Sequence, residues 1–139
     1  MKSEPVASTT RMIELSREEC LALLASVPVG RVCFTLKALP AIRPANHLLD
    51  GETVVIRTGT GSGLVRRGEG QDILVYEADE LDPSTRTGWS VMVTGRAGLV
   101  TSPQEAVRYR DLLIPWAGED LDEIIRLQTD LVTGYRLTR

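Results

Sequence analysis

The sequence is poor in aromatic residues and histidine, and both shortages narrow what the protein can do. Aromatic side chains make up 4% of the 139 residues, so a core has to be built from Val, Leu, Ile and Ala. His47 is the single histidine, so a serine triad or a multi-histidine metal site would have to be assembled around one residue. We therefore expect no metal site, and an enzyme of this sequence would draw its reactivity from a bound cofactor.

An excess of basic residues and long apolar runs are also lacking. A net charge of −3 argues against a nucleic-acid binder, which needs a clustered excess of Lys and Arg. No stretch approaches the roughly 20 apolar residues of a membrane helix, and the N-terminal MKSEPVASTT has no apolar signal-peptide core. We expect a cytoplasmic protein without a membrane segment, in which Cys20 and Cys33 are reduced, buried small hydrophobic residues.

The length suits one domain. Residues 1–11 show no periodicity and are predicted to form a flexible arm, and residues 12–139 a single domain. Ser16 with Glu19 has capping-box spacing and predicts a helix over about 17–26. Ser102, followed by Pro103, predicts a second helix to about residue 113.

Between and after these helices, β-rich segments alternate with turn signals. The expected strands span residues 32–36, 41–48, 53–58, 73–78 and 89–100, with one or two more between 124 and 137. Pro44 suggests a sheet edge or a bulge, and Asp50-Gly51 a two-residue hairpin turn. Gly95 and Gly98 would let the fifth strand bend as a barrel corner requires. The pattern favours a mostly antiparallel barrel or sandwich over a doubly wound sheet, and the fold class we expect is mainly β, a β-barrel with flanking α-helices.

The sharpest local signal is VVIRTGTGSGLVRR, residues 54–67. No acidic residue lies between Glu52 and Glu69, while three arginines accompany glycines and hydroxyl side chains. Glycines let main-chain N–H groups converge on an anion, and Arg57 could grip it with two donors. The alternative is a Gly-rich turn that leads into a short helix at 64–67, with solvated arginines. Neither the P-loop nor the GxGxxG spacing is present.

Three other side chains have open alternatives. His47 is either a residue that lines a pocket or a satisfied surface or cavity histidine. Trp89 and Trp116 stand at element boundaries, where pocket walls form, but buried tryptophans also serve as core.

Several segments, in order, resemble actinobacterial pyridoxamine 5'-phosphate oxidase-like proteins with the FMN-binding split barrel. They are GRVCF, ALPAIRPANHLLDG, VVIRTGTGSGL, TRTGWSVMVTGRA, PWAG and LVTGYRL, and together they cover about residues 12–137. The resemblance implies an antiparallel, Greek-key split barrel with flanking α-helices. It also implies a homodimer with two cofactor sites at the subunit interface. The cofactor it implies is FMN, with 8-hydroxy-5-deazaflavin and haem as the alternatives found in the superfamily.

The resemblance also assigns cofactor contacts. Arg57, Thr58 and Ser62 would grip the phosphate, and the main chain at Ala45 and Asn46 would run along the isoalloxazine ring. The full implied set is Ala45, Asn46, Arg57, Thr58, Ser62, Gly63, Leu64, Trp89 and Trp116. Gly63 stands where the family commonly has a lysine, and His47 where it often has a tyrosine.

The resulting expectation is an FMN-dependent oxidoreductase acting on a small molecule whose identity the sequence does not give. Pyridoxamine 5'-phosphate itself is not expected as the substrate, because the extra basic C-terminal residues of the true oxidases are missing. The alternatives are a cofactor-binding or ligand-sensing module without turnover and a deazaflavin-dependent reductase.

Overall fold

The structure is a computed structural model that describes residues 9–59, 72–114 and 123–139. The strands are β1 (Arg11–Glu14), β2 (Val29–Leu36), β3 (Leu39–Asp50), β4 (Thr53–Thr58), β5 (Asp72–Asp82), β6 (Thr87–Leu99), β7 (Glu123–Leu127) and β8 (Leu131–Thr138), and the helices are α1 (Arg17–Ala25) and α2 (Pro103–Leu112). Neither of these described helices has the length and apolar character needed to cross a membrane.

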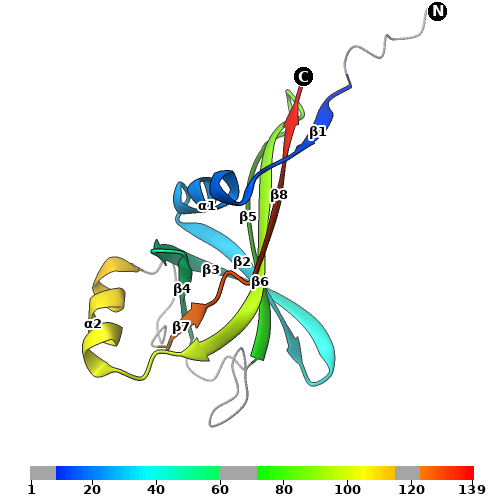
Figure 1. Ribbon diagram of the computed structural model, residues 1–139. Coiled ribbons are helices and arrows are strands. Elements are labelled where there is room, and N and C mark those ends of the chain that lie inside the picture. The colour runs from blue at the N-terminus through cyan, green and yellow to red at the C-terminus, as the bar shows by residue number, and fades with distance from the viewer. Residues whose placement is uncertain (1–8, 60–71, 115–122) are drawn as a thin grey trace, which may run out of the picture.

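All strand pairings are antiparallel, in the order β1-β8-β6-β5-β2-β3-β4-β7. Strand β6 also pairs with β7, at the far end of this order. The six strands β6-β5-β2-β3-β4-β7 therefore form a closed barrel. The β5–β6 hairpin, β8 and β1 continue beyond the barrel as a twisted ribbon (Figure 1). The predicted split barrel with flanking helices is confirmed.

Strand β6 bends where it changes partners. Its first half pairs with β8 up to Thr94, and its last residues pair with β7 from Ala97. Between them, a Cβ on Gly95 would lie 1.7 Å from the carbonyl oxygen of Gln128, so no side chain fits at this crossing. The bend predicted at Gly95 is therefore the corner that closes the barrel.

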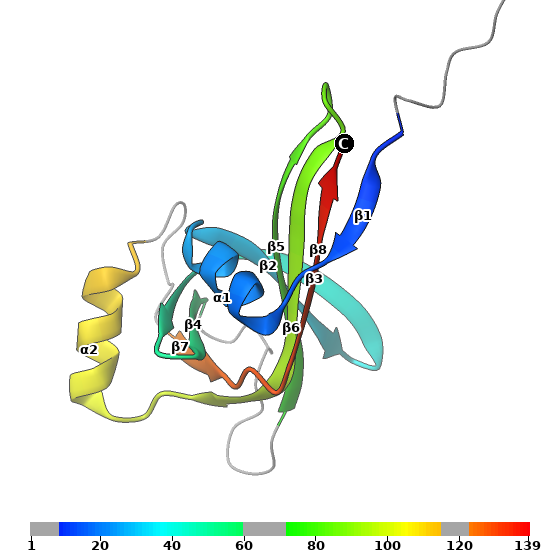
Figure 2. The ribbon, with the colours of Figure 1, turned by 45° about the horizontal axis from the view of Figure 1, so that its top comes forward.

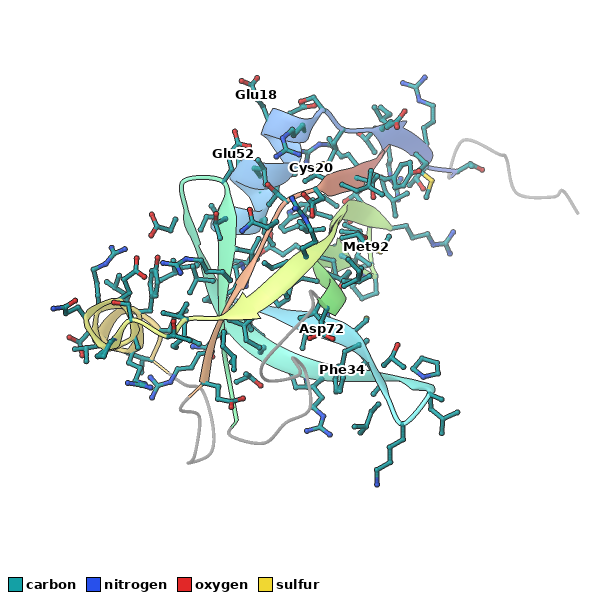
Figure 3. All side chains as sticks on the ribbon, turned by 60° about the horizontal axis from the view of Figure 1, so that its bottom comes forward. Glu18, Cys20, Phe34, Glu52, Asp72 and Met92 are labelled. Carbon is teal, nitrogen blue, oxygen red and sulfur yellow. The ribbon has the colours of Figure 1, made fainter. Side chains whose placement is uncertain are left out.

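Helix α1 begins at the predicted capping box, in which Ser16 and Glu19 bond each other's main chain. Its buried face carries Cys20, labelled in Figure 3, and Leu24, both fully buried in the main core. Gly134 of β8 makes room for the helix, since a Cβ there would lie 2.7 Å from the Cys20 sulfur. The capping signal in the sequence therefore fixes where α1 starts and which side chains it buries.

Helix α2 lies beside β4 and β7, over the outside of the barrel (Figure 2). Tyr109 and Leu113 pack against Val55 of β4 and Ile124 of β7 in a second, smaller core. The Tyr109 hydroxyl donates a 2.6 Å hydrogen bond to Asp50 at the end of β3. The two helices thus cover different parts of the sheet, and α2 covers the part that contains the candidate site.

Four sequence-based details need correction or comment. The two-residue turn after β3 is Gly51-Glu52, because Asp50 pairs with Thr53. A short strand, β1, begins at Arg11, where only an arm was expected; it forms because it pairs with β8. Cys33 is half-buried on the outer face of β2, not in the core. The short helix expected at 64–67 lies outside the described residues.

Candidate functional site

The candidate site begins with a cross-strand pair. Asn46 of β3 lies directly opposite Arg57 of β4 in the antiparallel ladder. Directly opposed residues place their side chains on the same face of a sheet, here the outer face under the end of α2. The register therefore unites two of the sequence-predicted site residues that are eleven positions apart.

Both side chains of this pair bind the C-terminal end of α2. Arg57 donates from one guanidinium nitrogen to the main-chain oxygens of Arg110 and Leu113, at 3.1 and 2.8 Å. The Asn46 amide donates to the Ile114 oxygen at 2.9 Å. The last carbonyls of a helix lack partners within the helix and carry partial negative charge, so a cation and an amide donor stabilise them. The contact of Arg57 with a phosphate stays a prediction.

Thr58 follows Arg57 and is buried, opposite Glu123 at the start of β7. Gly59 comes next and is the last described residue of the Gly-rich segment. Arg57, Thr58 and Gly59 are thus the described part of the predicted anion site, but the Thr58 side chain lies on the interior face of β4, opposite to that of Arg57. A contact of Thr58 with the phosphate stays a prediction. Ser62, Gly63, Leu64 and Trp116 lie outside the described residues, so their predicted cofactor contacts are not tested.

The main chain at Ala45 is held from inside the barrel. The Tyr76 hydroxyl of β5 lies 2.9 Å from the Ala45 oxygen and donates to it. Sequence reasoning missed Tyr76; the alternation of β5 could have indicated that its ring points inward, but not which main-chain oxygen it reaches. Burial raises the pKa of Tyr76, so its hydroxyl stays protonated over the ordinary pH range.

His47 is buried inside the barrel, with 5% of its surface exposed. Its ring contacts Tyr76 edge-on, and its two nitrogens contact the Tyr76 hydroxyl and the Leu24 main-chain oxygen. The expectation of an edge-like strand is wrong at this position, because β4 pairs with it at Ile56. His47 is therefore a satisfied interior residue and points to the opposite face from Asn46.

Trp89 is buried in the main core with the inward-facing residues of β6. Of the two interpretations given to it, core packing is the one that the structure confirms. A role as a wall against a cofactor ring stays a prediction.

The outer face of β3 continues past the site into an exposed apolar surface. Ile42, Pro44 and Asn46 alternate along the strand and share this face. The register places one row of side chains across five strands: Ile42, Cys33, Val75, Thr94 and Leu131. We call this row, with the neighbouring Met92 of β6 (Figure 3), the apolar row.

Comparison with known proteins places the chain in a family. An uncharacterized protein of Mycobacterium tuberculosis, Rv0080, is 46% identical over 134 residues, which span 94% of this chain and 88% of that protein. The crystal structure of a candidate pyridoxamine 5'-phosphate oxidase from Corynebacterium glutamicum has a TM-score of 0.72 at 29% identity, covering 91% of this chain and 94% of its own. The FAD binding protein from Mycobacterium smegmatis has a TM-score of 0.66 at 27% identity, covering 91% and 98%. The family model described as pyridoxamine 5'-phosphate oxidase matches residues 16–136, and the chain therefore belongs to the pyridoxamine 5'-phosphate oxidase family.

Proposed function

We propose that the protein binds a flavin, as FMN, beside the Asn46–Arg57 pair and uses it to oxidise or reduce a small molecule. The observation that carries this proposal is the register that sets Asn46 opposite Arg57 where the Gly-rich segment begins. Family membership supports it, as does the likeness to the FAD binding protein of Mycobacterium smegmatis.

The described donors suit the two ends of a flavin nucleotide. A guanidinium on Arg57 and the glycine main chain at Gly59 match the needs of a phosphate. The Asn46 amide offers both a donor and an acceptor, which match the polar edge of a flavin ring. The donor set therefore fits the cofactor that the sequence resemblance implies.

In this proposal the residues of the chain bind and orient, and the cofactor supplies the reaction. A bound flavin can accept or donate a hydride, chemistry that no described side chain of this site provides. Arg57 supplies positive charge for the phosphate, and its bonds to α2 hold the guanidinium in place. The buried Asn46 presents its amide from a position largely closed to water, which strengthens its hydrogen bonds.

We further propose that two copies of the chain associate through the apolar row and enclose the site. Ile42 and Leu131 at its ends are 61% and 57% exposed, and Met92 beside it is 45% exposed. A mostly apolar row of this kind, interrupted only by the hydroxyl of Thr94, favours a protein partner on a protein whose net charge is −3. Because Asn46 and the apolar row share one face of β3, a second copy seated on the row would border the cofactor.

The proposal is tested by titrating the purified protein with FMN and FAD and following the visible flavin bands and flavin fluorescence. Replacing Arg57 with Ala should weaken binding about 10- to 150-fold, the worth of a hydrogen bond to a charged group. Arg11→Ala removes the same charge on β1, far from the site (Figure 1), and should leave affinity unchanged.

Because Arg57 also holds the end of α2, circular dichroism must show that the variant is folded. Colourless protein that responds to neither flavin would contradict the proposal and favour a module with another ligand. A spectral response to 8-hydroxy-5-deazaflavin alone would favour the deazaflavin-dependent reductase.

A further inference from the structure

Inside the barrel, four groups from α1, β3 and β5 form one chain of short polar contacts. The His47 Nε2 lies 2.9 Å from the Leu24 oxygen, and the His47 Nδ1 lies 2.5 Å from the Tyr76 hydroxyl. The Tyr76 hydroxyl in turn lies 2.9 Å from the Ala45 oxygen. The chain therefore contains three contacts, and each of them needs one proton to be a hydrogen bond.

A neutral histidine and a tyrosine bring only two protons to these three contacts. Two of the acceptors are carbonyl oxygens, which cannot donate. If His47 donates to Leu24, then Tyr76 has a single proton for both the His47 Nδ1 and the Ala45 oxygen. Protonation of His47 supplies the third proton, and Tyr76 can then donate to Ala45 without losing its bond to the histidine.

The packing fixes this arrangement. A Cβ on Gly30 would lie 2.6 Å from the Tyr76 ring, so the glycine leaves the space that the ring occupies. The Gly30 main-chain N–H also donates to the Tyr76 hydroxyl oxygen, and this bond uses no proton of His47 or Tyr76. The His47 main-chain N–H donates to the Pro28 oxygen at 3.0 Å. The ring and the strand are thus held from several sides, which leaves the position of one proton as the variable.

We propose that His47 and Tyr76 form a proton-dependent clamp on the β3 main chain at Ala45, and that the charge on His47 sets how firmly the Ala45–Asn46 segment is held for its cofactor. The part that concerns the cofactor rests on the proposed function above. His47 and Tyr76 are positioning residues in this inference, since neither faces the side of β3 that carries Asn46.

The surroundings decide where the clamp titrates. Burial lowers the pKa of His47, and the Leu24 carbonyl partly offsets this by accepting from the ring. On α1 the buried neighbour is the Cys20 thiol, whose pKa is raised by burial. On β2 and β5 the charged neighbours of Tyr76 are Arg31 and Glu77, which pair with each other at 2.8 Å. On β4, Arg57 faces the opposite side of the sheet. Protonation of His47 is therefore expected below its ordinary pKa of 6.5.

The test uses the fact that His47 is the only histidine. In ¹⁵N-labelled protein with any affinity tag removed, the imidazole signals belong to this residue alone. We expect a protonated Nε2 and an accepting Nδ1 at pH 7.5, and a titration midpoint below 6.5. Tyr76→Phe should shift the Nδ1 signal and the midpoint. A ring that titrates at 6.5 or above, with signals unchanged in the Tyr76→Phe variant, would overturn the clamp.

The cofactor part is tested by FMN affinity between pH 7.5 and 5.5. His47→Gln keeps a donor and an acceptor but cannot titrate, and the cofactor phosphate, with its own pKa near 6, behaves alike in both proteins. The ratio of wild-type to His47→Gln affinity should rise about threefold to tenfold on acidification, the effect of one added hydrogen bond. A constant ratio would overturn this part. If the protein binds neither flavin, the proposed function and the cofactor part of this inference are both refuted. The imidazole signals would still test whether the clamp exists.

Discussion

The corner of β6 allows a sharp test of how the barrel closes. In a Gly95→Ala variant the new Cβ would lie 1.7 Å from the Gln128 oxygen and 2.8 Å from its carbonyl carbon. Ordinary contacts at these atoms are no shorter than about 3.4 Å, and main-chain atoms cannot rotate away. The segment from Gln128 to Asp130 therefore has to move away from β6.

The size of the effect follows from what that movement breaks. The Gln128 N–H donates to the Arg96 oxygen at 2.8 Å, and the Asp130 carboxylate accepts from the Arg96 N–H at 3.0 Å. Overpacking costs about 1–3 kcal/mol, and two weakened hydrogen bonds add about 0.5–1.5 kcal/mol each. We expect a loss of about 2–6 kcal/mol in the free energy of unfolding, and a lower Tm by roughly 3 °C for each kcal/mol.

The matched control is Gly98→Ala, three residues along the same strand. No atom lies within 4 Å of a Cβ at Gly98, so this variant should be neutral or about 0.4–1 kcal/mol more stable. Both variants are compared with wild type by urea unfolding at one protein concentration, since association shifts apparent stability. Equal losses in the two variants, or no loss in Gly95→Ala, would refute the steric account of the corner.

Three further predictions concern charge, association and the site. The Arg96 guanidinium and main-chain N–H lower the pKa of Asp130 to about 2. The stability that this interaction contributes is present above about pH 4 and is lost as the pH falls toward 2. The urea midpoint should therefore change less between pH 6 and pH 3 in Asp130→Asn than in the wild type. Ile42→Asp should lower the molar mass measured by light scattering from that of a dimer to that of a monomer, whereas Leu81→Asp, at a similarly exposed position on the β5–β6 hairpin, should not. Asn46→Ala should lower the free energy of unfolding by about 1 kcal/mol, because the hydrogen bond to the Ile114 oxygen just after α2 is lost. An unchanged urea midpoint would show that this bond does not stabilise the fold.

The helices and most strands could be predicted because their signals are local. The Ser16–Glu19 capping box specifies the start of α1 within a few residues of chain, and the structure confirms it. β4 has the predicted bounds, Thr53–Thr58. In contrast, β1 carries no signal of its own: all four of its residues are exposed, and it exists because β8 pairs with it. Such a strand depends on a partner more than a hundred residues away, which a local pattern does not specify.

The direction of His47 shows a second limit of the same kind. Two neighbours in a strand point to opposite faces, so Asn46 and His47 cannot both face the cofactor. The sequence marked both as candidates, and the burial of His47 with its bonds to Tyr76 and Leu24 assigns it to the interior. Neither partner is near His47 in sequence, and a single histidine gives no pattern from which to infer them.

The register between β3 and β4 depends on which two residues form the turn that joins them. Asp50-Gly51 resembles the common two-residue hairpin with positive φ at both positions, and such a turn would have set Asn46 opposite Val55. In the structure the turn is Gly51-Glu52, with glycine first at φ +62°, as the other common hairpin type requires. Moving a turn by one residue moves every partner across the hairpin by two. The glycine after Asp50 therefore decides that Asn46 meets Arg57, the pair on which the proposed cofactor site depends.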